Sequence, residues 1–115
     1  MNYAGRMNAF VLKGKTIFDA IAVYKTTEGM THLEFNYPEH IAGYDLEEIK
    51  KAMGNLKVNG FAVRWRKGFL DGNFTNPDDD LRQKAIDMCK EAADTCRELG
   101  GSVITLWLEN DGFDY

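Results

Sequence analysis

The feature that most constrains this fold is one pattern that recurs along the chain. A short apolar segment is followed by a polar loop, and then by an amphipathic helical segment that ends near a glycine. Strands and helices that alternate in this order are typical of parallel sheets with right-handed crossovers. The sequence therefore predicts an α/β fold built from parallel βα units.

Hydrophobic periodicity predicts four strands and three helices. The expected strands cover residues 7–12, 33–37, 58–65 and 103–108, and the expected helices cover residues 16–28, 46–53 and 77–99. The fourth strand is a nearly unbroken apolar run, which is expected of a parallel strand that is covered on both faces.

The helix starts carry capping signals. Thr16 and Asp45 each precede an acidic residue by three positions, which is the spacing of a reciprocal capping box. Asn76 is expected to cap the last helix, with Pro77 as its first residue, because proline suits that position.

Two architectures fit this order: a barrel segment and a small doubly wound sheet. A (β/α)₈ barrel has about 31 residues per βα unit, so four strands and three helices amount to half of one. Residues 13–16 contain a Gly-Lys-Thr run but lack the spacing of a phosphate-binding loop. We therefore expect residues 1–115 to form a single unit, the N-terminal half of a TIM barrel.

Composition limits the partners. The net charge of -4 argues against nucleic-acid binding, and no apolar run approaches the roughly 20 residues that cross a membrane. Cys89 and Cys96 are seven residues apart in one expected helix, about 10 Å along its axis, which is too far for a disulfide. A cytoplasmic location is expected.

The loops that follow strands form the active site in parallel α/β folds, so the residues just past Tyr37, Trp65 and Leu108 are the ones to consider. The loop over residues 66–77 is long, and long loops are often functional.

Residues 68–112 carry a family resemblance. They read GFLDGNFTNPDDDLRQKAIDMCKEAADTCRELGGSVITLWLENDG. This stretch resembles xylose isomerase-like sugar isomerases, which have an F-x-D-G-x-F-T loop, a long helix, an E-L-G turn and a strand that ends in tryptophan with an acidic-Gly pair four residues on. Residues 1–67 resemble the family only in the alternation of predicted strands and helices. The resemblance implies a metal-dependent aldose–ketose isomerase or epimerase, in which a divalent ion (Mn, Mg or Co) binds the open-chain sugar while a proton or hydride moves between neighbouring carbons.

The resemblance also implies roles for individual residues. Trp107 and Phe69 would form aromatic walls against the sugar, although either residue would also fit a role in packing. Xylose isomerases place a histidine, and an aspartate three residues later, after the second strand, a pair suited to opening the sugar ring. Here Asn36 and Glu39 stand at those positions, and His40 is adjacent. We expect His40 and Glu39 as catalytic residues and Asn36 as a substrate-binding residue, with a sugar specificity other than that of xylose isomerase.

Charged residues around these positions leave alternatives open. Asp111, Glu109 and Asp114 would form an acidic mouth that binds sugar hydroxyls or lies near a metal, or they are a solvated loop. Asp111 is expected to bind substrate. The basic residues Arg64, Arg66 and Lys67 could bind a sugar phosphate, but Arg64 and Arg66 share a strand face, where ion pairing with neighbouring carboxylates is expected instead.

In the family the metal ligands come from later barrel strands, so we expect no tight metal site in this chain and no activity from it alone. The leading expectation is the N-terminal half of a sugar isomerase or epimerase. Alternatives are a C-glycoside-cleaving or keto-sugar-processing relative, or a non-catalytic half-barrel that associates with itself or a separate half through its open edges and an apolar inner face. Endonuclease relatives are disfavoured by the acidic charge.

Overall fold

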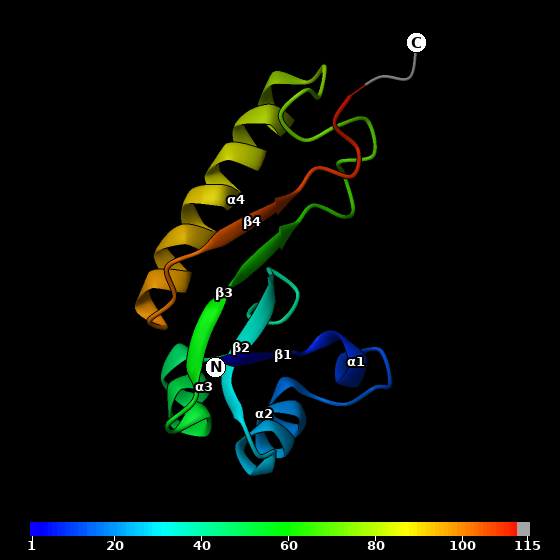
Figure 1. Cartoon of the computed structure of the whole chain (residues 1–115). Helices are drawn as coiled ribbons and strands as arrows, with labels where there is room; N and C mark the ends of the chain where they lie inside the picture. The colour runs from blue at the N-terminus through cyan, green and yellow to red at the C-terminus, as the bar shows by residue number, and fades with distance from the viewer. Residues whose placement is uncertain (113–115) are drawn as a thin grey trace.

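The computed structural model describes residues 1–112. Its elements, in chain order, are β1 (Tyr3–Arg6), α1 (Asn8–Val11), α2 (Ile17–Thr26), β2 (Met30–Tyr37), α3 (Leu46–Met53), β3 (Lys57–Arg64), α4 (Asp79–Glu98) and β4 (Ile104–Trp107). All strands are parallel, and they form one sheet in the order β1-β2-β3-β4 (Figure 1). The predicted α/β fold with parallel βα units is confirmed.

The three long helices pack against the same face of the sheet. Phe35 of β2 and Phe61 of β3 contact each other edge to face, with ring centroids 5.9 Å apart. They belong to a core that also contains residues of α2, α3 and α4, among them Ile21, Ile49 and Cys96. A second core cluster joins Val63 of β3 to Ala85 and Ala92 of α4.

This one-sided cover separates the two architectures that fitted the sequence. When strands are adjacent in chain order and the crossovers keep one hand, every helix lies on the same side of the sheet. A doubly wound sheet needs a reversal of strand order, which places helices on both faces. The sequential order β1-β2-β3-β4 has no such reversal, so the arrangement is half-barrel-like.

The expectation of an apolar inner face is wrong. Side chains alternate along a strand, and the large apolar ones of β2 and β3 from Leu33 to Val63 point to the helices. The opposite face, which we call the inner face, carries mostly polar residues: Arg6, His32, Glu34, Asn36, Asn59, Arg64 and Thr105.

The expected first strand, residues 7–12, is also wrong. The strand lies earlier, at Tyr3–Arg6, and Asn8–Val11 forms one turn of helix. The cause is tertiary. The Tyr24 hydroxyl donates a hydrogen bond to the Arg6 carbonyl (2.8 Å), and its ring lies where a Cβ on Gly5 would stand, so β1 packs closely on α2. Met7 is then fully buried at the strand's end.

Two of the three capping predictions hold at least in part. The Thr16–Asp19 capping box is present, with Asp19 N donating to Thr16 Oγ1 (3.1 Å) and Thr16 N donating to Asp19 Oδ2 (2.7 Å). Asp45 caps α3 by accepting from Glu47 N (2.9 Å).

The third capping prediction is wrong, because Asp78 and not Asn76 caps α4. The Asp78 carboxylate accepts from the amides of Asp80 and Leu81. Asn76 is buried and instead ties its loop together, donating to the Gly72 carbonyl (2.8 Å) and accepting from Asp78 N (2.9 Å).

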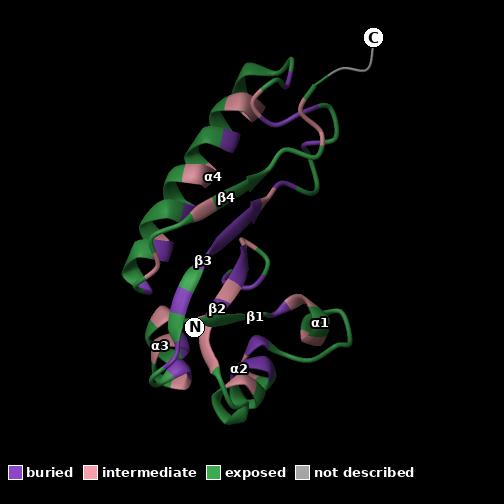
Figure 2. Cartoon of the chain, in the orientation of Figure 1, coloured by how far each residue is buried: buried purple, intermediate pink, exposed green. Residues whose placement is uncertain are grey.

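The fourth strand is not covered on both faces as expected. Ile104 is half-buried, and residues 105–107 are exposed (Figure 2). β4 lies at the edge of the sheet, where α4 covers it from one side only. This openness is visible in the dimensions of the chain: the radius of gyration is 15.3 Å, whereas a compact chain of this length has about 13 Å.

None of the helices in residues 1–112 combines the length and the apolar character needed to cross a membrane. Cys89 and Cys96 are both free thiols, and burial raises the pKa of each.

Gly60 allows β3 and β4 to pair, and its replacement gives a test of the fold. A Cβ at this position would lie 2.6 Å from the Val103 carbonyl oxygen, a backbone atom that cannot rotate away. We expect Gly60→Ala to lower the free energy of unfolding by about 1–3 kcal/mol, as overpacking does. The neighbouring exposed variant Asn59→Ala should change it by less than about 0.5 kcal/mol. Urea unfolding measures both, and equal stability of the two variants would contradict the packing described.

Candidate functional site

The carboxyl ends of the strands bring charged side chains from all four βα units together. We call this group the carboxyl-edge cluster; its members are Arg6, Glu34, Glu39, Arg64, Arg66, Trp107 and Glu109. In parallel barrels this edge is where binding sites form.

The arginines and glutamates of the cluster are paired one to one. Arg6 lies 3.2 Å from Glu34, Arg66 lies 2.7 Å from Glu39, and Arg64 lies 3.1 Å from Glu109. A further contact of 3.8 Å joins Arg66 to Glu109 and connects two of the pairs. The expected ion pairing of Arg64 and Arg66 is confirmed, and the cluster as a whole carries no surplus of either charge.

Arg64 is the most enclosed charge in the cluster, with its side chain 13% exposed. Its guanidinium stacks over the Trp107 ring, 4.4 Å from the ring centre. Its Nε is buried and makes no hydrogen bond within the described residues. Trp107 itself is 40% exposed, so a large aromatic surface stays open to solvent at this edge.

His40 lies beneath the cluster and is almost completely buried. Its Nδ1 stands 2.8 Å from the backbone nitrogen of Asn36. A backbone N–H can only donate, so Nδ1 is the unprotonated acceptor and the ring proton of the neutral imidazole is on Nε2. Burial lowers the pKa of His40, the charges of Arg6 and Arg64 act in the same direction, and Glu39 opposes them. The neutral ring can donate a hydrogen bond through Nε2.

Glu39 is held as an anion. Burial acts to raise its pKa, but the hydrogen bond and charge of Arg66 prevail, with a smaller contribution from a hydrogen bond of Asn36, so the pKa lies below its ordinary value. A carboxylate of low pKa is a good hydrogen-bond acceptor and a weak general base.

Asn36 connects His40 to α1. Its side-chain amide donates to Asn8 Oδ1 of α1 (2.7 Å), and its backbone holds His40. Sequence reasoning missed Asn8, Arg6 and Glu34. Since it placed the first strand at residues 7–12, it put Arg6 before the strand and not at its carboxyl end.

Phe69 and Trp107 are not brought together. Phe69 is buried with Val63, Trp65 and residues of α4, on the helix-covered face of the sheet. Trp107 is the register partner of Arg64 and lies with it on the inner face. The two aromatic residues therefore do not form one shared wall.

Asp111 is engaged by the loop that precedes α4. Its carboxylate accepts from the backbone amides of Asn73, Phe74 (3.1 Å) and Thr75 (3.2 Å), and from the Thr75 hydroxyl (3.0 Å). Burial acts to raise its pKa, but these hydrogen bonds prevail and lower it. Asp111 thus fastens the chain after β4 to this loop. The third member of the expected acidic mouth, Asp114, lies outside the described residues.

A cavity of about 430 Å³ opens beside the cluster, between residues 65–70 and the chain after β4, with Arg66 and Glu109 in its wall. A larger cavity, of about 510 Å³, lies at the opposite edge of the sheet.

Within residues 1–112, no three His, Cys, Asp or Glu side chains converge as metal ligands would. No protein-family model matches the chain, and no curated protein sequence matches it.

The buried His40 predicts a dependence of stability on pH. Since its pKa is lower in the folded chain than in the unfolded one, the unfolded state binds more protons below neutrality. The free energy of unfolding should therefore fall between pH 7 and pH 5. In His40→Asn, whose side-chain oxygen can still accept from Asn36 N, this fall should be smaller, and urea midpoints at both pH values measure it. An unchanged pH dependence would contradict a neutral, buried His40.

Proposed function

We propose that the carboxyl-edge cluster binds a neutral monosaccharide, and that the chain is the N-terminal half-barrel of a metal-dependent sugar isomerase or epimerase resembling the xylose isomerases. The observation that carries the sugar-binding part is Trp107, an open aromatic surface beside three Arg–Glu pairs.

An aromatic ring beside polar groups suits a sugar, which has an apolar C–H surface and polar hydroxyl groups. An aromatic ring packs against the apolar C–H surface of the sugar, and polar groups at the edge bind its hydroxyls. An arginine has five N–H donors, so each one keeps donors beyond those used by its glutamate. Each glutamate likewise keeps acceptor sites.

The charge balance favours a neutral ligand over a sugar phosphate. Arg6, Arg64 and Arg66 are each compensated by a glutamate within 3.2 Å. A phosphate site would place an excess of positive charge around the anion. The cluster itself has none, and Lys67 lies in the wall of the neighbouring cavity. We therefore assign the cluster hydroxyl groups and not a phosphate.

In this proposal the expected catalytic pair has binding roles. Glu39 accepts hydrogen bonds from sugar hydroxyls, because Arg66 keeps it anionic. His40 supports the site through Asn36 and offers Nε2–H as a donor. Phe69 and Asp111 do not contact the sugar in this proposal; they hold the loop before α4 in place.

A divalent metal, which the family resemblance implies for the complete enzyme, does not fit the described residues. The three glutamates of the cluster each face an arginine, and a cation would have to displace a guanidinium to reach them. We assign no step of the reaction to a metal held by residues 1–112, and the half-barrel is proposed to supply the sugar-binding wall.

Removing the aromatic surface tests the proposal. Trp107→Ala should weaken binding of neutral monosaccharides by about tenfold or more, which corresponds to the 1.5–3 kcal/mol of a buried large side chain. Leu108→Ala is the matched control, because it removes an equally exposed apolar side chain at the next position. Saturation-transfer NMR with a panel of aldoses, ketoses and their phosphates measures the effect. Absence of binding to the unmodified chain, or equal binding by Trp107→Ala, would contradict it.

A second candidate function is assembly with another copy of the chain. β4 is an exposed edge strand, and the apolar side chains of Val103 (51% exposed), Leu106 (42%) and Leu108 (45%) line it. Exposed apolar edges of this kind promote association. The accessible surface is 7305 Å², about 900 Å² more than the roughly 6,400 Å² expected of a compact monomer of this mass. That excess is similar to one side of a standard interface.

A twofold axis along the barrel would place β4 of one copy beside β1 of the other, with both strands parallel, and eight strands would close. Light scattering should then give twice the 13.1 kDa of one chain. Leu106→Asp should shift the population to monomers, whereas Val23→Asp, an exposed position on α2, should not. A folded, monomeric unmodified chain at all concentrations would rule this assembly out.

A further inference from the structure

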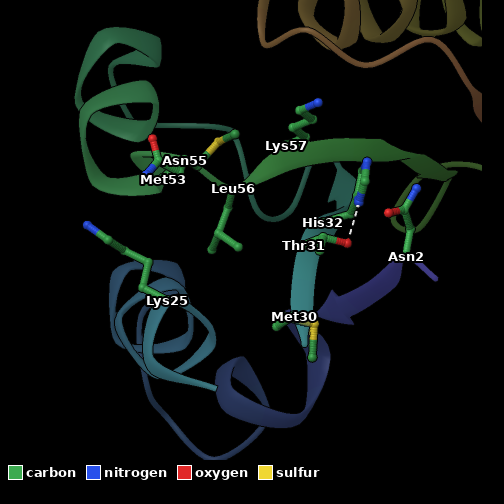
Figure 3. A pocket seen from close by; sticks show the side chains of 9 residues that line it. All are labelled: Asn2, Lys25, Met30, Thr31, His32, Met53, Asn55, Leu56 and Lys57. Atoms are coloured by element: carbon green, nitrogen blue, oxygen red, sulfur yellow. Dashed lines mark hydrogen bonds between the residues drawn. The ribbon is translucent and has the colours of Figure 1, made fainter. Parts of the chain in front are cut away.

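A cavity of about 510 Å³ lies at the amino ends of the strands. We call it the amino-edge pocket. The residues that line it are Asn2, Lys25, Met30, Thr31, His32, Met53, Asn55, Leu56 and Lys57 (Figure 3). They come from the N-terminal segment, the end of α2, the start of β2 and the segment from the end of α3 to the start of β3. The carboxyl-edge cluster lies at the other end of the same strands.

The floor of the pocket is apolar and firmly supported. Met53 and Leu56 are buried members of the main core, and Met30 packs against that core. Figure 3 shows Leu56 projecting into the space between α2 and β2. Methionine side chains adapt to ligands of different shape, so this floor suits a flexible or flat apolar group.

The rim of the pocket is cationic. Lys25 of α2 and Lys57 at the start of β3 lie on opposite sides of Leu56, and Figure 3 shows their side chains pointing away from each other. No acidic residue lines the pocket, and neither lysine forms an ion pair within the described residues. Lys50 of α3, by contrast, pairs with both Glu47 and Glu98. Two uncompensated cations beside one pocket are notable in a chain whose net charge is -4.

Local contacts hold the polar groups of the rim in place. The amine of Lys25 lies near Gly54, the C-cap of α3, where the helix dipole attracts a cation. His32 Nδ1 is 2.8 Å from Thr31 Oγ1, which also hydrogen-bonds the backbone of Tyr3. No hydrogen bond among residues 1–112 uses His32 Nε2, so this nitrogen can face a ligand.

We propose that the amino-edge pocket binds a small amphipathic carboxylate, with its apolar body on Met30, Met53 and Leu56 and its carboxylate at one of the two lysines that flank this floor. An apolar floor beside uncompensated amines matches both parts of such a ligand. The pocket has no glycine-rich phosphate loop or helix N-terminus, the features that bind nucleotide phosphates. This site is separate from the carboxyl-edge cluster and does not depend on its proposed sugar.

Octanoate is a suitable probe, and it is titrated against the full chain while backbone amide NMR signals are followed. We expect saturable shifts at residues 30–32 and 53–57. Octanol, which has a similar apolar body without the charge, should bind at least tenfold more weakly. The double variant Lys25→Gln/Lys57→Gln should lose at least tenfold in octanoate affinity, and it should fold normally because both side chains are exposed.

The matched control is Lys13→Gln/Lys15→Gln, which removes the same charge from exposed positions outside the pocket. It should bind octanoate as the unmodified chain does. Equal loss in both double variants would show attraction by net charge alone and would overturn the proposal. So would octanol binding as tightly as octanoate, or shifts that do not cluster at the pocket.

Discussion

The burial of one apolar face of the sheet beneath three helices is the interaction on which the rest of the structure depends. Phe35 and Phe61 form its centre, and side chains of α2, α3 and α4 close around them. Burial of this apolar area supplies most of the stability of so small a chain. The large apolar side chains of β2 and β3 from Leu33 to Val63 all lie on this buried face. The inner face is consequently left to polar and charged side chains.

That division gives the two edges of the sheet different chemistry. At the carboxyl edge, arginines and glutamates from separate βα units meet and neutralise one another around the open Trp107 ring. At the amino edge, Lys25 and Lys57 stay uncompensated above a floor that continues into the main core. The first arrangement favours neutral hydroxyl groups and the second favours an anion with an apolar body. We therefore propose two separate ligand sites at the two ends of the same strands.

Several predictions that rested on neighbouring residues were confirmed. The Thr16–Asp19 capping box depends on residues three positions apart, and the second strand was predicted from the alternation of Leu33, Phe35 and Tyr37 with polar neighbours. The pairing of Arg64 and Arg66 with carboxylates followed from their shared strand face. The start of β1 was predicted wrongly because it depends on a distant partner, Tyr24. The cap of α4 was a local prediction and was also wrong, because the Asn76 side chain bonds to the Gly72 carbonyl and the Asp78 amide. The cover of β4 was also predicted wrongly, because the strand lies at the edge of the sheet and residues 105–107 stay exposed.

The sequence by itself determined the parallel α/β class and the alternation of strands with the three long helices, because hydrophobic periodicity and helix caps are local properties of the chain. It also placed Trp107, Glu39 and His40 at the ends of strands. Only the tertiary structure decided which side chains meet. It put Phe69 and Trp107 on opposite faces, joined Arg6 to Glu34, and committed Asp111 to the loop before α4. The reason is that such contacts depend on strand register and on the face that each residue occupies. A shift of one residue in the register moves every side chain of the strand to the other face.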